Sequence, residues 1–174
     1  MRTLRAIAVA YESIQDRILA VVNPSSLDSW SFWLTRRLVI MLLERLPAVL
    51  EATSAMAKQA PAEYRSDLVA FEQEAAMATT ASAMSQTALT VMKNNAAAAE
   101  LAISLAIADQ RGTFRLELHG ERGGQAAGIF GRAELQRILQ MIRDEAARAH
   151  WLSAPGQPPI SSDAETTAAK PMRH

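Results

Sequence analysis

The sequence predicts an α+β fold built from two tandem β-β-β-α units, joined by a helical linker and followed by a disordered C-terminal tail. Three observations support this fold class. Alternating apolar residues, typical of strands, occur three times before residue 35 and return between residues 101 and 130. Each series runs into a segment whose apolar residues have helical spacing. Residues 153–174 are rich in proline and almost free of large apolar residues, which favours disorder.

The chain of 174 residues is long enough to form one domain with a buried core. We expect that single α+β domain to cover residues 1–152. Its first unit is assigned to residues 4–52, the helical, low-complexity linker to 53–100 and the second unit to 101–152. The tail is assigned to residues 153–174.

The first unit begins with two strands, at residues 4–11 and 17–22, whose apolar side chains alternate. An Asn-Pro-Ser-Ser turn follows, and then an aromatic strand from Trp30 to Leu34. Trp33 interrupts the polar phase of that strand, so we expect the strand to be covered on both faces. The short links favour an antiparallel meander.

A helix is expected directly after this strand. Thr35 is a good N-cap because its hydroxyl can accept a hydrogen bond from a free first-turn amide. The apolar face of the helix is wide, and Pro47 should kink or restart it. The residues predicted to be buried where strand and helix share one apolar layer are Trp33, Leu34, Leu42 and Leu46.

The middle of the chain has a different character. An amphipathic helix is predicted at residues 62–78, with Tyr64, Leu68, Phe71 and Ala75 at helical spacing. Residues 79–99 are low-complexity Ala, Ser, Thr and Met, which suits either a helix or a mobile linker.

The second unit repeats the pattern of the first. Strands are predicted at residues 101–108, 113–119 and 126–130, the last one weak. In the first of them four large apolar residues share one phase, and in the second Phe114, Leu116 and Leu118 point inward. Gly131 opens a helix whose apolar residues are Leu135, Ile138, Leu139 and Ile142.

The two units align without a gap when Arg36 is placed on Arg132, an offset of 96 residues (132 − 36). Ile18 then falls on Phe114, and the strands, turns and helices share one register. The pattern predicts an internal duplication with a pseudo-two-fold arrangement. Trp30 and Phe32 fall on Ala126 and Gly128, so the second copy lacks the aromatic strand.

The run DRILAVVN (Asp16–Asn23), a turn and the run SFWLTRRLV (Ser31–Val39) resemble a set of uncharacterised bacterial proteins. A later meander, a final helix and the ending Ala149-His150-Trp151 extend the resemblance over both units. The resemblance implies a fold pattern and no catalytic activity.

Composition narrows the function classes. Eighteen basic and eighteen acidic side chains cancel, which argues against a general polyanion binder. The absence of cysteine excludes disulfides and thiolate metal sites and agrees with a cytoplasmic location. The short apolar run near the N-terminus does not reach the length of a signal-peptide core, and no stretch reaches membrane-span length. We expect no cofactor and no metal.

Two groups of residues have the types that chemistry requires but lack the necessary pattern. His119 and Glu117 share the outward face of a strand, yet no third ligand or nucleophile accompanies them. The glycines of residues 120–131 match no phosphate-binding fingerprint, so a hairpin turn is the better interpretation. We therefore predict that the protein is not an enzyme.

The candidate binding residues are Trp33, Arg36, Arg37 and Arg132. Arginine at a helix N-terminus is electrostatically unfavourable, which suggests an acidic partner or a bond to the second unit. We predict a non-enzymatic binding or assembly role, through self-association or a protein partner. The alternative is a single-stranded nucleic-acid-binding protein that uses its sheet faces and Arg36 and Arg37.

Overall fold

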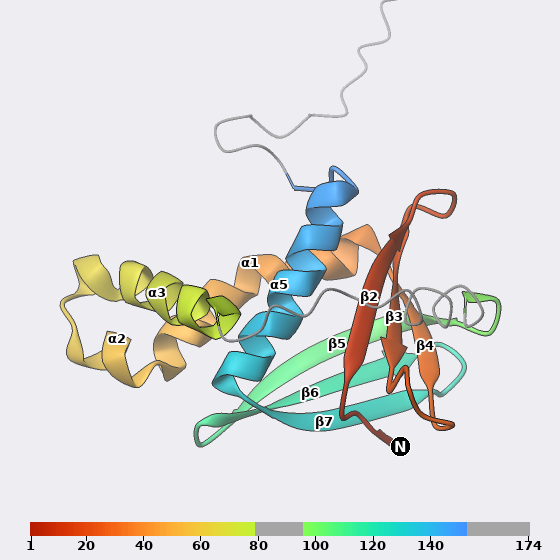
Figure 1. Cartoon of the computed structure of the whole chain (residues 1–174), viewed down its shortest axis with the longest axis horizontal. Coiled ribbons are helices and arrows are strands. Elements are labelled where there is room, and N and C mark those ends of the chain that lie inside the picture. The colour runs from red at the N-terminus through yellow and green to blue at the C-terminus, as the bar shows by residue number, and fades with distance from the viewer. Residues whose placement is uncertain (79–95, 153–174) are drawn as a thin grey trace, which may run out of the picture.

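The computed structural model describes residues 1–78 and 96–152 and has a mixed α+β fold (Figure 1). Its strands form one curled seven-stranded sheet in the order β1-β7-β6-β5-β4-β3-β2. The strands are β1 (Arg2–Thr3), β2 (Ile7–Glu12), β3 (Arg17–Val22), β4 (Trp30–Leu34), β5 (Glu100–Gln110), β6 (Thr113–Gly120) and β7 (Gln125–Gly131). The described helices are α1 (Arg36–Thr53), α2 (Ala55–Gln59), the 3-10 turn η1 (Ala62–Tyr64), α3 (Arg65–Ala78) and α5 (Arg132–Arg148).

Both predicted meanders are present. Strands β2, β3 and β4 pair antiparallel, as do β5, β6 and β7. Two parallel pairings complete the sheet. Phe32 of β4 lies opposite Glu100 of β5, and Arg2 of β1 lies opposite Ala126 of β7.

The first predicted strand, at residues 4–11, begins later in the structure: β2 starts at Ile7, and a bend at residues 4–6 connects it to the short strand β1, which was not predicted. Asn23, with a positive φ of 50°, holds this bend. Its Oδ1 accepts hydrogen bonds from the amides of Arg5 (2.9 Å) and Ala6 (3.2 Å). Its Nδ2 donates to the Thr3 carbonyl at 2.7 Å. The Asn23 side chain thereby satisfies backbone groups at the junction of β1 and β2, where one strand pairing ends and the next begins.

Helix α1 starts where the sequence predicts, because Thr35 caps it by accepting from the Leu38 amide at 3.3 Å. The expectation that the helix restarts at Pro47 is wrong. The helix continues through Pro47 to Thr53, because proline removes only one hydrogen bond and its neighbours Leu46 and Leu50 remain buried in the core.

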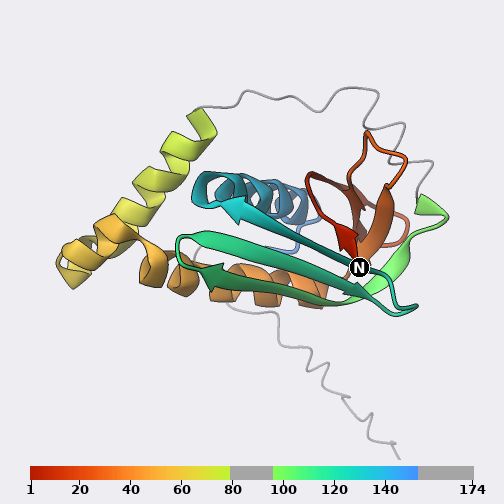
Figure 2. The ribbon, with the colours of Figure 1, turned by 90° about the horizontal axis from the view of Figure 1, so that it is seen from below.

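The core lies between the inner face of the sheet and helices α1 and α5 (Figure 2). The predicted inward residues of β6 and the four predicted apolar residues of α5 are all buried. Trp33, Leu34 and Leu46 are buried as expected, whereas Leu42 is half-buried. Trp33 packs on the opposite face of β4 with Leu19 and Val21, so this strand is covered on both faces.

Strand β5 departs from the predicted single apolar face. The register shifts between Ala102 and Ser104, and this bulge leaves Ile103 63% exposed. Leu105 and Ile107 then pack against the main core, whereas Leu101 packs beside Trp33. A bulge changes which side of the sheet successive residues face, and alternation in the sequence does not reveal it.

The end of α5 is anchored by Trp151. His150 adopts a positive φ of 54°, and the Trp151 amide donates to the Ala146 carbonyl at 3.0 Å, as in a Schellman motif. The buried indole donates from Nε1 to Asp16 Oδ1 at 2.8 Å. The predicted tail and most of the low-complexity segment lie outside the described residues.

Candidate interaction surface

The turn η1 and helix α3 expose apolar side chains that an amphipathic helix would ordinarily bury. Tyr64 is 55% exposed and Phe71 is 61% exposed, and half-buried Leu68 lies between them on the same face. We call these three residues the stripe. The opposite face of α3 carries the buried residues Val69 and Ala76. Helix α3 is therefore apolar on two sides, and the side that carries Val69 is the buried one.

The stripe lies on a part of the molecule that projects from the sheet. Helices α2 and α3 extend away from the strands in both views (Figures 1 and 2). We call residues 55–78 the arm. Its base packs on α1 and α5 through an apolar cluster that includes Leu50, Ala57, Val69 and Leu139. The arm thus presents its outer face to solvent while its inner face belongs to the core.

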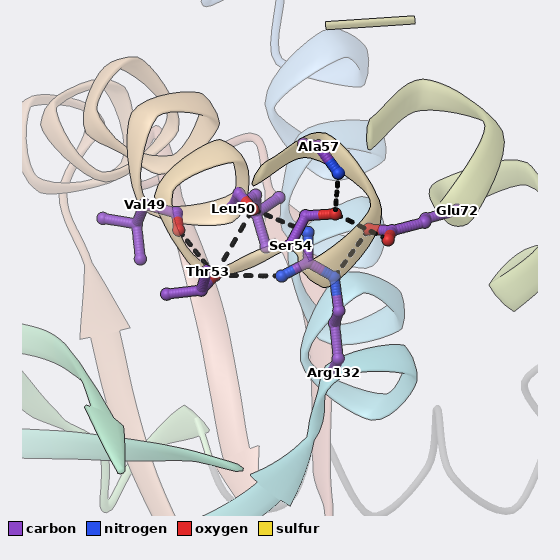
Figure 3. Close-up of polar contacts among 7 residues, drawn as sticks. All are labelled: Val49, Leu50, Thr53, Ser54, Ala57, Glu72 and Arg132. Atoms are coloured by element: carbon purple, nitrogen blue, oxygen red, sulfur yellow. Dashed lines mark hydrogen bonds and ion pairs between the residues drawn. The ribbon is translucent and has the colours of Figure 1, made fainter. Parts of the chain in front are cut away.

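A polar clamp around Arg132 fixes the arm to the two long helices (Figure 3). Arg132 Nε donates to Glu72 Oε2 of α3 at 2.7 Å. The same guanidinium donates to the Leu50 carbonyl at 2.7 Å and to Thr53 Oγ1 at 2.9 Å. Three separate acceptors are thus held by one planar, permanently charged group.

Ser54 completes the clamp at the junction of α1 and α2. Its fully buried hydroxyl accepts from the Ala57 amide at 3.0 Å, which caps α2, and donates to Glu72 Oε1 at 2.8 Å. Both carboxylate oxygens of Glu72 are therefore occupied. The side chains of Arg132 and Glu72 are 20% and 17% exposed, so the ion pair is largely shielded from water.

The exposed flank of the stripe is acidic. Glu63, Asp67 and Glu74 are exposed and lie along one side of the apolar residues. On the other side, Arg65 donates to the Ala60 carbonyl and Glu72 belongs to the clamp. A partner for this face would therefore combine apolar side chains with positive charge.

The sequence-predicted site residues are not brought together. Trp33 is 6% exposed, so its ring is packed within the protein rather than presented beside the arginines. Arg36 and Arg37 are exposed at the start of α1. Arg132 contacts the opposite end of α1, about 20 Å from Arg36 at 1.5 Å per residue. The bond expected from Arg36 or Arg37 to the second predicted unit stays a prediction, and the contacts of Arg132 with α1 and α3 were not predicted.

The glycine-containing turn between β6 and β7 surrounds a buried carboxylate instead of an open anion site. Glu100 is 1% exposed. Its Oε2 accepts from the amides of Arg122 (2.9 Å) and Gly124 (3.3 Å), and its Oε1 accepts from Trp30 Nε1 at 2.6 Å. A Cβ on Gly124 would lie 1.6 Å from Glu100 Oε1. The two backbone amides that could have bound a phosphate therefore donate to the Glu100 carboxylate of the protein itself.

His119 and Glu117 share the outer face of β6 as predicted, with 3.6 Å between His119 Nε2 and Glu117 Oε2. A hydrogen bond from Arg115 lowers the pKa of Glu117, so this carboxylate is held in its charged form. Within residues 1–78 and 96–152, no group of three His, Cys, Asp or Glu side chains is placed to hold a metal ion.

Comparison with known proteins adds no family: no family model matches the chain, and neither curated proteins nor solved structures show a significant similarity to it. In the described part of the chain, none of the helices combines the length and apolar character needed to cross a membrane.

Proposed function

We propose that the chain is a non-enzymatic binding or assembly protein, and that the stripe on the arm is the surface through which it contacts another protein chain. The observation that carries this proposal is the exposure of Tyr64 in η1 and Phe71 in α3 on the outer side of the projecting arm. Tyr and Phe are enriched at protein interfaces, and grouped exposed aromatics mark interaction sites.

The clamp supports the same proposal because it makes the arm rigid. A surface held in its binding geometry loses less conformational entropy on association than a mobile one. The clamp joins the end of α1, the cap of α2 and the middle of α3 through shielded hydrogen bonds. Such an arrangement positions a docking helix and supplies no nucleophile or proton donor to a substrate.

The proposal includes an internal duplication that produced the two sheet halves. It is supported by helices that start at Arg36 and Arg132, at the constant offset of 96 residues. Shifting the pair Phe32↔Glu100 by that offset in each direction gives Gly128↔Leu4, which has the register of the observed pair Arg2↔Ala126 (128 − 4 = 126 − 2). An experimental structure should superpose β2–β4 and α1 on β5–β7 and α5 by a rotation near 180°, and an unrelated packing would refute the duplication.

The binding role can be tested by photo-crosslinking in cells. A photoreactive phenylalanine analogue at exposed Ala70, beside the stripe, should give a crosslinked protein product. Phe71→Ser should abolish that product without lowering the melting temperature, because Phe71 is 61% exposed. The same analogue at Ile129, which is 60% exposed on β7, is the matched control. Equal crosslinking from positions 70 and 129 would refute the role of the arm.

A further inference from the structure

An apolar groove lies between α1 and β5 and has a volume of about 270 Å³. Its floor and walls include Leu38, Leu42 and Val49 of α1 and Leu105 and Ile107 of β5, all half-buried. Met41, 37% exposed, stands at its edge. We call this site the α1–β5 groove. It is concave and apolar, whereas the stripe on the arm is a convex apolar ridge.

The charges around the groove are opposite to those around the stripe. Arg45 lines the groove, and Arg37 lies one helical turn before Met41 on the same exposed side of α1. Within the described residues neither arginine forms an ion pair, and Glu44 is the one acidic neighbour on that side of the helix between them. The stripe is flanked by Asp67 and Glu74.

This charge pattern discriminates between two ways of pairing copies of the chain. If two stripes packed against each other antiparallel, Asp67 of one copy would approach Glu74 of the other, and like charges would oppose the contact. If the stripe packed into the α1–β5 groove, the acidic flank would meet Arg37 and Arg45. The groove is thus complementary to the stripe in polarity and charge.

We propose that the occupant of the α1–β5 groove is the stripe of a second copy of this chain, with Phe71 inserted beside Met41. The proposal rests on the proposed function of the arm and names its partner. Each copy offers an arm at one place and a groove at another. Reciprocal exchange of arms across a two-fold axis gives a dimer, whereas a contact that is not reciprocated repeats into rings or open chains.

Two blocked variants test this arrangement. Phe71→Asp removes the arm's anchor, and Met41→Asp places an acid where the incoming flank is acidic; both positions are exposed enough to leave folding intact. In sedimentation velocity over a range of concentrations, the wild-type chain should form dimers or larger species. Each variant alone should weaken association by about thirtyfold or more, as for an aromatic interface anchor. An equimolar mixture should give a one-to-one dimer, because one intact arm then meets one intact groove.

Charge reversal provides an independent readout. The double variant Asp67→Lys with Glu74→Lys should associate more weakly than wild type. Mixing it with a second double variant, Arg37→Glu with Arg45→Glu, should restore association between the two variants. Ile129→Asp, at a similarly exposed position on β7, is the control that should leave the sedimentation pattern unchanged.

Three outcomes would overturn the inference: a mixture that stays monomeric, assembly of Phe71→Asp as strong as that of wild type, or a wild-type chain that is monomeric at every concentration. If crosslinking at position 70 nevertheless captures a different protein, the binding role of the arm stands and only the identity of its partner fails.

Discussion

Arg132 is the member of the clamp whose loss would remove the most hydrogen bonds. In Arg132→Ala, the Leu50 carbonyl and Thr53 hydroxyl each lose a donor, and Glu72 keeps only the Ser54 hydroxyl. A hydrogen bond to a charged group contributes about 1.5–3 kcal/mol and a neutral one about 1 kcal/mol. Water can reach part of the site, since Arg132 is 20% exposed. We therefore expect the free energy of unfolding to fall by about 2–4 kcal/mol, less than the sum of the three bonds.

Urea unfolding followed by far-ultraviolet circular dichroism measures this loss, and Arg36→Ala is the matched control. Arg36 is the same residue type at the same first position of a helix, but it is exposed. Its replacement should change stability by no more than about 0.5 kcal/mol. Arg132→Lys should give an intermediate loss, because an ammonium cannot reach three separated acceptors. A loss below about 1 kcal/mol in Arg132→Ala, or one equal to that in Arg36→Ala, would refute the clamp.

A double-mutant cycle and hydrogen exchange show where in the protein the stability loss of Arg132→Ala arises. Glu72→Ala combined with Arg132→Ala should cost less than the two single changes together, because the residues share one ion pair. Amides of α2 and α3 should exchange faster in Arg132→Ala, whereas those of β6 should change little. Unchanged protection of the arm would show that Val69 and its apolar neighbours hold it without the clamp.

Further predictions concern the apolar core, the pairing of β1 with β7, the pH dependence of stability and the binding of nucleic acid. Leu46→Ala should cost about 2–5 kcal/mol in urea unfolding, because Leu46 is 4% exposed between α1 and the arm; a cost below about 0.5 kcal/mol would contradict this. Gly128→Ala should loosen β1, because a Cβ would lie 2.0 Å from the Leu4 carbonyl oxygen; unchanged exchange at the Leu4 amide would argue against it. Hydrogen bonds from Trp151 and Tyr11 lower the pKa of Asp16, so its contribution to stability is present above the ordinary aspartate value and is lost as pH falls through the depressed one. Asp16→Asn should therefore flatten the decline in melting temperature below about pH 4, and an unchanged decline would contradict the assignment. Single-stranded oligonucleotides should not bind at physiological salt, and salt-sensitive binding that Arg36→Ala with Arg37→Ala abolishes would instead favour the nucleic-acid alternative.

The sequence was informative wherever local pattern and local structure agree. Strand β3 has the predicted bounds, and Thr35 and Gly131 precede the two long helices as expected. The Gln110-Arg111-Gly112 turn is tight because Arg111 and Gly112 both have positive φ, the combination that two-residue hairpins require. In each case the deciding interactions lie within a few residues of one another.

The features that the sequence did not predict depend on contacts between residues far apart in the chain. The break between β1 and β2 depends on Asn23, about twenty residues away, and the bulge in β5 depends on pairing with β6. The sequence predicted a helix here with Tyr64, Leu68, Phe71 and Ala75 as its apolar face, but the residues of α3 that are buried are Val69 and Ala76, because periodicity does not state which side of a helix meets the core. Arg132 was chosen as the counterpart of Arg36, and nothing near it in sequence indicates that its acceptors lie on α1 and α3.

The two helix-opening arginines show how one position can acquire different roles. Arg132 at the start of α5 reaches the Leu50 carbonyl near the end of α1, where the helix dipole is negative, and this offsets its unfavourable place at a helix N-terminus. Under the proposed duplication, Arg36 at the start of α1 should likewise approach the end of α5. It lies close enough to Asp16 to help lower the pKa of that carboxyl, and Asp16 binds Trp151 just beyond α5. At that end Trp151 fills the space with a buried ring, and Arg36 stays at the surface. At the end of α1 the chain continues into α2, and Arg132 is enclosed beneath the arm. The anchoring role of Arg132 therefore depends on the segment that follows α1, and it could not be inferred by comparing the two helix starts alone.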